Sequence, residues 1–205
     1  MQTINHLYDD HATARKVLEE LERSGVATED ISLLASETAA HYPSNSGVIE
    51  SSTRHVAAAD SHGTANGAMV GGAIGAGAGI LAAIGSLAIP GLGPLVAAGV
   101  LATALATATG GAVAGGLIGA LTSYGIEERD AQVYAEGIRR GGTLVSVRTS
   151  DERAVAVEAI MTRHDPINTT ERRQAYSEKG WSTYDPAAPV YTRAEIERDR
   201  VRYPL

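Results

Sequence analysis

The chain has 205 residues, a net charge of −7 and no cysteine. A net negative charge gives no electrostatic basis for nucleic-acid binding, and the absence of cysteine excludes disulfides and thiol chemistry. The first residues, MQTINHLYDDHATARK, lack the charged start and apolar run of a signal peptide. We therefore expect a cytoplasmic protein that binds no nucleic acid.

Charged residues are distributed very unevenly. From Gly63 to Ile126 the chain has no Asp, Glu, Lys, Arg or His, whereas both flanks carry charges at ordinary density. Phe is absent and 23 residues are Gly, so a core must consist mainly of Ile, Leu, Val and Ala. These contrasts divide the chain into the first half of an α+β domain (1–36), a flexible linker (37–62), a charge-free segment (63–125), the second half of the domain (126–175) and a tail (176–205).

The first half is predicted to fold as strand, helix and strand. Residues 3–8 form a candidate strand, and Asp9 or Asp10 then caps a helix that ends before Gly25. The second candidate strand covers 30–35. The helix has a single apolar stripe with the spacing of one buried face, formed by Ala14, Val17, Leu18 and Leu21.

The second half has the same order of elements. Residues 127–140 favour a helix that is acidic at its start and basic at its end, as the helix dipole prefers. Residues 143–149 alternate like a strand, and Ser150 caps the next helix. A last strand is predicted over 167–172. The apolar positions of the helix after Ser150 are Ala154, Val157, Ile160 and Met161.

The two halves align with each other at an offset of 140 residues. Thr3 falls on Thr143, and the apolar positions of the first helix fall on those of the helix after Ser150. Two such units build a ferredoxin-like sheet with helices on one face, which is the fold we expect. The alternative is a chance agreement between two amphipathic helices.

The charge-free segment is predicted to be a helical hairpin. Its arms are Gly67 to Ile89 and Pro94 to Ser123, and a helix as long as the first arm spans about 34 Å, close to the hydrocarbon thickness of a bilayer. The sequence between the arms cannot continue a helix, so it forms the tip. The tip residues are Pro90, Gly91, Gly93 and Pro94.

Glycines recur every four residues in both arms. Residues four apart share a helix face, and a face of small residues lets two helices approach closely. We expect this glycine zipper to carry helix packing or assembly. Its members are Gly67, Gly71, Gly75 and Gly79 in the first arm and Gly111, Gly115 and Gly119 in the second.

Three surroundings can keep such glycine-rich helices folded. They are a cytoplasmic membrane entered by the hairpin, the interior of a homo-oligomer, and a closed bundle within one chain. The arm length and the lack of charge favour lipid, whereas the high Ala and Gly content and the missing aromatic belt argue against it. The expected partners are therefore further copies of the chain or a lipid bilayer.

The tail contains the aromatic residues Trp181, Tyr184 and Tyr191, which are candidates for docking on the domain or on a neighbouring subunit. The alternative is a loosely held C-terminus. Thr192 and Glu195 have the spacing of a capping box and predict a short charged helix after them.

Motifs for catalysis, cofactors and metals give no specific match. The GxGxxA pattern at 77–82 follows no strand, and the six histidines lack the spacing of a metal site and are expected to be solvated loop residues. Asp60, Ser61 and His62 are adjacent but lie in the linker. We therefore predict no enzyme, cofactor or metal site.

The charge-free segment and the helix after it resemble a known family. LAIPGLGPLVAAG followed by GIEERDAQVYAEGIRRGGTLVSV is similar to the bacterial general stress protein 17M-like group, also called DUF1269 or YflT-like, over about residues 3–175. The resemblance implies a role in the stress response without an established enzymatic activity. A small-ligand-binding regulatory protein with the hairpin buried between subunits is the alternative.

Overall fold

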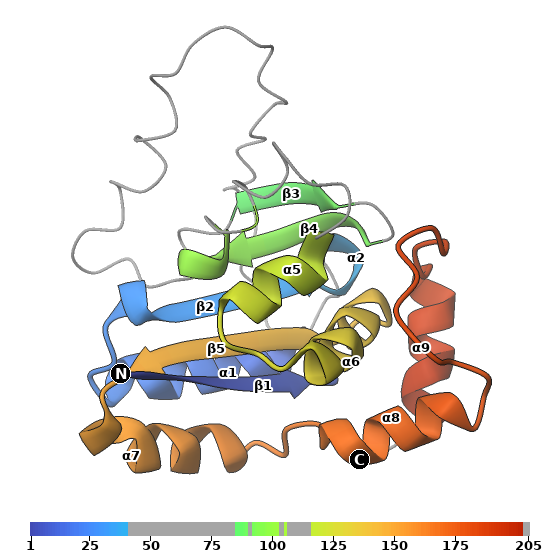
Figure 1. Ribbon diagram of the computed structural model, residues 1–205. Helices are drawn as coiled ribbons and strands as arrows, with labels where there is room; N and C mark the ends of the chain where they lie inside the picture. The colour runs from blue at the N-terminus through green and yellow to red at the C-terminus, as the bar shows by residue number, and fades with distance from the viewer. Residues whose placement is uncertain (41–84, 90–91, 103–104, 106–115, 203–205) are drawn as a thin grey trace, which may run out of the picture.

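The computed structural model describes residues 1–40, 85–89, 92–102, 105 and 116–202, and these build an α+β fold around a five-stranded antiparallel sheet (Figure 1). The strands are β1 (Gln2–Tyr8), β2 (Ile31–Ser36), β3 (Gly85–Ile89), β4 (Gly93–Ala98) and β5 (Thr143–Thr149). The helices are α1 (His11–Arg23), α2 (Glu37–Ala40), α5 (Gly116–Ser123), α6 (Glu128–Arg139), α7 (Asp151–Thr162), α8 (Thr169–Ser177) and α9 (Arg193–Arg202).

The strands follow the order β1-β5-β2-β4-β3, so β5 lies between the two strands that α1 connects. The register of β1 and β5 relates the two halves of the chain. Asn5 pairs with Ser146, and His6 pairs with Val145. With the offset of 140, Asn5 corresponds to Val145 and His6 corresponds to Ser146. Each pair therefore joins a residue of β1 to the residue of β5 that corresponds to its neighbour in β1. The two strand–helix units are therefore arranged around a local two-fold axis, with α1 packing on β5 and α7 packing on β1.

Helices cover both faces of the sheet (Figure 1). α1 and α7 pack on one face and bury Leu18, Val157 and Met161 against Leu33 and Val145. On the other face, α5 and α6 belong to a second cluster of buried apolar side chains. The sequence predicts helices on one face of the sheet only, but the structure has a layer of helices on each face. Strands that are buried on both faces need a covering layer on each of them.

The predicted first half is confirmed within a residue or two at each boundary. Asp10, rather than Asp9, caps α1, and its carboxylate accepts a hydrogen bond from the backbone N–H of Thr13 at 2.8 Å. Gly25 ends the helix with φ +84°, a conformation that glycine adopts most easily. The four stripe residues of α1 are all fully buried.

The strand predicted over 167–172 is wrong. Asn168 instead caps α8, and its side chain accepts hydrogen bonds from the N–H groups of Thr170 and Glu171. Ile167 still lies along β1 and donates its N–H to the Leu7 carbonyl at 2.7 Å. The first residues of the predicted flexible linker, 37–40, form the helix α2.

The predicted helical hairpin is also wrong around its tip. Residues 85–89 and 93–98 are strands, and β4 pairs with β2. The run from Leu95 to Ala98 alternates between the two buried clusters, which suits an interior strand better than a helix. Pro94 lies outside the paired residues of β2 and β4, so its missing N–H costs that ladder no hydrogen bond.

Most of the predicted zipper lies outside the described residues. This applies to Gly67, Gly71, Gly75, Gly79, Gly111 and Gly115. Gly119 lies in α5, where an added Cβ would meet no atom of the described residues within 4 Å, so no contact in this part of the chain requires its small size. Within the parts of the chain that the structure describes, every helix is too short or too polar to cross a bilayer.

Candidate functional site: an arginine cluster beneath the tail

Six charged side chains from four parts of the chain meet where the tail crosses the domain. They come from the end of β1, the end of α6, α8 and α9 (Figure 1). We call this group the arginine cluster, and it consists of Asp9, Glu136, Arg139, Arg140, Arg172 and Asp199.

Glu136 is the central carboxylate of the cluster and is completely buried. It accepts hydrogen bonds from Arg139 Nε at 3.0 Å and Nη2 at 2.6 Å, and from Arg140 Nε at 2.6 Å. These arginines follow Glu136 by three and four residues at the C-terminal end of α6, where helix geometry and dipole both favour cations. A buried carboxylate is tolerated only with such partners.

Arg140 connects α6 to the tail. Its Nη1 donates to a carboxylate oxygen of Asp199 at 2.8 Å, and its guanidinium lies 4.3 Å from the centre of the Tyr176 ring. Burial alone would lower the pKa of Arg140, but the carboxylates of Glu136 and Asp199 raise it overall. The guanidinium is therefore a permanent cation held between α6, α8 and α9.

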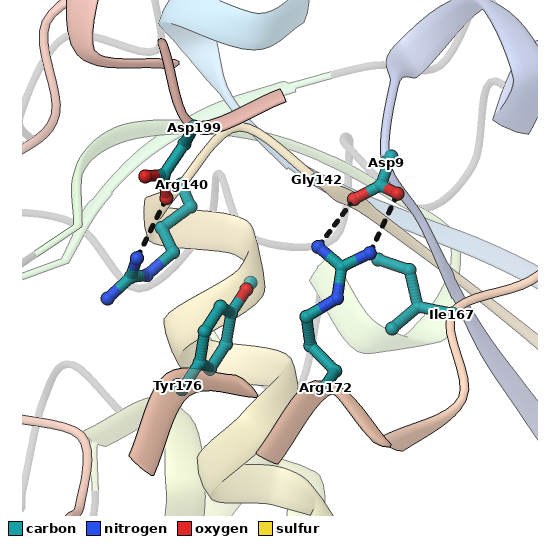
Figure 2. Close-up of a pocket in the computed structure, with 8 residues that line it drawn as sticks. Asp9, Arg140, Gly142, Ile167, Arg172, Tyr176 and Asp199 are labelled. Atoms are coloured by element: carbon teal, nitrogen blue, oxygen red, sulfur yellow. Dashed lines mark hydrogen bonds and ion pairs between the residues drawn. The ribbon is translucent and has the colours of Figure 1, made fainter. Parts of the chain in front are cut away.

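Arg172 makes the second connection, between α8 and the end of β1. Its two Nη groups donate to the two oxygens of Asp9 at 2.9 and 2.8 Å, the fork geometry of a strong arginine–carboxylate pair. Burial opposes the charge, yet the hydrogen bonds with Asp9 raise the pKa of Arg172. Figure 2 shows Tyr176 between Arg140 and Arg172, and burial raises the pKa of its phenol despite these cations.

A small cavity lies among these side chains, with room for about one water molecule. It is lined by Asp9, Gly137, Arg140, Gly142, Ile167, Arg172, Tyr176 and Asp199. Each carboxylate of the cluster is paired with a guanidinium, so the group is suited to holding segments together rather than to moving protons. Among the described residues, no three His, Asp or Glu side chains are grouped as a metal site.

The aromatic residues predicted for tail docking lie against the domain. Tyr184 is 8 % exposed, and Gln132 Oε1 accepts a hydrogen bond from its backbone N–H at 2.9 Å. The ring of Tyr191 lies 5.0 Å from the Arg139 guanidinium. Trp181 packs edge-on against Tyr176, with ring centres 5.6 Å apart. Burial raises the pKa of Tyr184 to about 12.

α9 closes the contact between the tail and the domain. The predicted capping box is confirmed, because Thr192 N donates to a Glu195 carboxylate oxygen at 2.8 Å and Glu195 N donates to Thr192 Oγ1 at 3.4 Å. Ile196 is buried against Gly141, which has φ +95°. A Cβ on Gly141 would lie 2.5 Å from Ile196 Cγ2, so this glycine provides the notch into which the isoleucine fits.

Three of the six histidines lie within the described residues. His6 lies in β1 and contacts Glu158 of α7 at 3.0 Å, and His164 contacts Glu20 of α1 at 2.7 Å. His11 is buried at the start of α1. The expectation of solvated loop residues is wrong for His6 and His11, which lie in β1 and α1, whereas His164 lies in the turn after α7. His41, His55 and His62 lie outside the described residues.

Sequence reasoning missed the arginine cluster. A local signal was present at Glu136, where arginines follow at the third and fourth positions of a helix, but surface helices often carry such pairs. Asp9, Arg172 and Asp199 carry no local signal, because their partners lie 163 and 59 residues away. Of the predicted tip residues, Gly93 and Pro94 begin strand β4 and pair with Ile89 and Ala88 of β3, whereas Pro90 and Gly91 lie outside the described residues.

Compared with family models, curated proteins and solved structures, the chain has no significant match in any of the three. The resemblance to the general stress protein 17M-like group therefore stays a prediction from the quoted residues.

Proposed function

We propose that this chain is a non-enzymatic, stress-associated protein that assembles with copies of itself through its charge-free segment. The observation that carries the proposal is the way this segment is joined to the domain. Strands β3 and β4 extend the sheet beyond β2, and α5 packs against α6. The association with stress follows from the family resemblance. In this proposal the core of the domain is ferredoxin-like, with β5 between β1 and β2.

The joined parts of the segment are buried in the domain. Leu95, Leu101, Leu105 and Leu117 are each at most 1 % exposed and belong to one apolar cluster with α6. The glycine-spaced stretches therefore connect to fixed points of a folded domain. Uncharged stretches rich in glycine stay helical only when other apolar groups pack on them, because glycine costs about 1 kcal/mol relative to alanine in an exposed helix.

The position of the tip supports assembly over a bilayer-crossing hairpin. Strands β3 and β4, which flank the predicted tip, pair with each other in the sheet, whereas a re-entering hairpin needs its tip at the far side of the bilayer. Further copies of the chain can supply the apolar partner without moving β3 and β4 out of the sheet. Homo-oligomeric contact through the glycine-spaced stretches is therefore the form of the proposal that we favour.

The test is the mass of the full-length protein in detergent-free solution, measured by light scattering. We expect a defined oligomer, and we expect the combined substitutions Gly75→Leu and Gly115→Leu to reduce its mass to that of one chain. Gly75→Ala with Gly115→Ala is the matched control, because alanine keeps the face small, and it should keep the oligomer.

Two results would overturn the proposal. One is a wild-type protein with the mass of a single chain, and the other is a leucine variant with unchanged mass. Flotation with vesicles of phosphatidylcholine and phosphatidylglycerol tests the lipid alternative on the same sample. Protein that floats in a manner dependent on residues 67–84 would replace self-assembly by membrane attachment.

A further inference from the structure

We propose that α9 is exchanged between copies of this protein, so that the surface receiving α9 within one chain also receives α9 of a second copy. The receiving surface, which we call the α9 receptor, includes Arg140 and Gly141, which contact α9 itself, and Arg139, which contacts the preceding Tyr191. The proposal concerns a different surface from the glycine-spaced stretches.

The receptor recognises two side chains on one face of α9. Ile196 is 1 % exposed and fits the notch over Gly141, and Asp199 is 8 % exposed and accepts a hydrogen bond from Arg140. These residues are three apart and so lie on the same helix face. The neighbours Glu197 and Arg198 are exposed. The α9 receptor therefore binds a helix that carries an isoleucine and, three residues later, an aspartate.

Every copy of the chain carries both the receptor and this pattern. The contact between Asp199 and Arg140 and the packing of Ile196 on Gly141 involve no residue of the connection, so they are the same whether α9 comes from its own chain or from another. Exchange of an identical element needs no new interface, which makes it a low-cost route to association. The α9 helix of a second copy therefore fits the α9 receptor with the same contacts as the helix of the same chain.

The connection to α9 is suited to exchange. Between the anchored Tyr184 and Tyr191, the residues Asp185, Pro186, Ala187 and Pro189 are exposed. Prolines favour an extended chain of about 3.1 Å per residue, so the six residues 185–190 between the two tyrosines reach about 19 Å. Tyr191, whose ring lies over Arg139 and Arg140, moves together with α9 in the exchange.

The local concentration of α9 at the receptor decides whether a receptor holds the α9 of its own chain or that of a second copy. A short tether gives α9 an effective concentration in the millimolar range at its own receptor, so isolated chains keep their own helix. Copies that are held together at a similar local concentration exchange helices at little free-energy cost. Tail exchange would then strengthen an assembly that other contacts have started.

Shortening the connection tests the inference. Deleting residues 186–189 from the full-length chain removes about 12 Å of the reach between Tyr184 and Tyr191, and we expect this to keep α9 from its own receptor while Tyr184 and Asp199 are retained. The deletion is made in the Gly75→Leu, Gly115→Leu background, so that each mass is compared with that of the same background without the deletion. We expect light scattering to show a twofold increase in mass.

The matched control adds Asp199→Lys to the shortened chain, which places a cation opposite Arg140 and should return the mass to that of the unshortened chain. A shortened, folded protein with unchanged mass would overturn the inference. This outcome is independent of the proposed function, which fails when the leucine substitutions leave the wild-type mass unchanged.

A second measurement requires no deletion and covers the case in which the shortened chain does not fold. The unshortened chain in the same background is followed by light scattering up to millimolar concentration. We expect its mass to rise toward twice the starting value, and Asp199→Lys to abolish the rise. A mass that stays constant over this range, or a rise that Asp199→Lys leaves intact, would contradict tail exchange.

Discussion

The two faces of the sheet are closed by different kinds of interaction. On the face of α1 and α7, the buried contacts are almost entirely apolar, from Leu18 and Leu21 to Met161. On the face of α6, an apolar cluster is extended by the arginine cluster, which fastens α8 and α9 to the domain (Figure 2). The first face is held by surface removed from water, and the second depends in addition on charges that must all be paired.

This difference predicts different responses to substitution. Apolar burial is lost gradually, in proportion to the atoms removed, whereas a buried charge without its partner is penalised for its whole desolvation.

Substituting the central carboxylate should destabilise the protein most. Glu136→Gln leaves Arg139 and Arg140 without their shared carboxylate, and breaking a buried ion pair in this way lowers the free energy of unfolding by about 3 to 5 kcal/mol. Urea denaturation measures the change. Glu128→Gln, on an exposed residue at the start of the same helix, is the control and should change it by less than about 0.5 kcal/mol. Equal effects would show that the cluster does not hold the fold.

The apolar face should respond to loss of volume. Leu18→Ala removes a fully buried side chain from the contact between α1 and the sheet, so we expect the free energy of unfolding to fall by about 3 kcal/mol. The exposed neighbour Glu19 provides the control through Glu19→Ala. The effects of Leu18→Ala and Glu136→Gln should add, because the two sites lie on opposite faces of the sheet.

The contrast between apolar packing and paired charges also explains which elements could be predicted from the sequence. The stripe of α1 and the alternation of residues 143–149 are periodic signals, and both elements are predicted within one or two residues. The repeat at an offset of 140 also corresponds to a real relation, the local two-fold axis of β1 and β5. Periodicity is informative here because each residue's environment follows from its position along a helix or strand.

The features that were not predicted correctly from the sequence share a different cause. Residues 93–98 are uncharged and apolar, and a run buried on both faces of a sheet has the composition of a buried helix, so periodicity could not separate the two. The pairings of Asp9 with Arg172 and of Arg140 with Asp199 depend on the tertiary fold. Such partners become visible only when the elements are placed in space.

Alkaline pH should weaken the tail side of the molecule. Burial raises the pKa of Tyr184 to about 12, from an ordinary value of 10.0. A raised pKa means that the folded state keeps its proton longer, so its contribution to stability is complete below pH 10 and is lost between about pH 10 and 12. Two pH units correspond to about 2.7 kcal/mol for this one phenol. Urea denaturation at pH 9 and at pH 11.5 measures the loss, which should be smaller in Tyr184→Phe.

The smallest expected effect isolates the seat of α9. Gly141 and Gly25 both have positive φ, so an alanine at either position is strained by about 1 to 2 kcal/mol. Of these two glycines only Gly141 has a side chain packed tightly against it, since a Cβ at Gly25 would lie 4.0 Å from the end of the Arg153 side chain. Gly141→Ala should therefore lower the free energy of unfolding by about 1 to 2 kcal/mol more than Gly25→Ala.

The excess should vanish when Ile196→Ala is present, because the colliding atoms are then removed. A double-mutant cycle in urea measures this coupling between Gly141 and Ile196. If Gly141→Ala and Gly25→Ala are equally destabilising, α9 is held by the charge of Asp199 alone, and the contrast between an apolar and a charged side becomes sharper. If the excess is present and disappears with Ile196→Ala, the tail depends on shape as well as on charge, and the two sides differ only in degree.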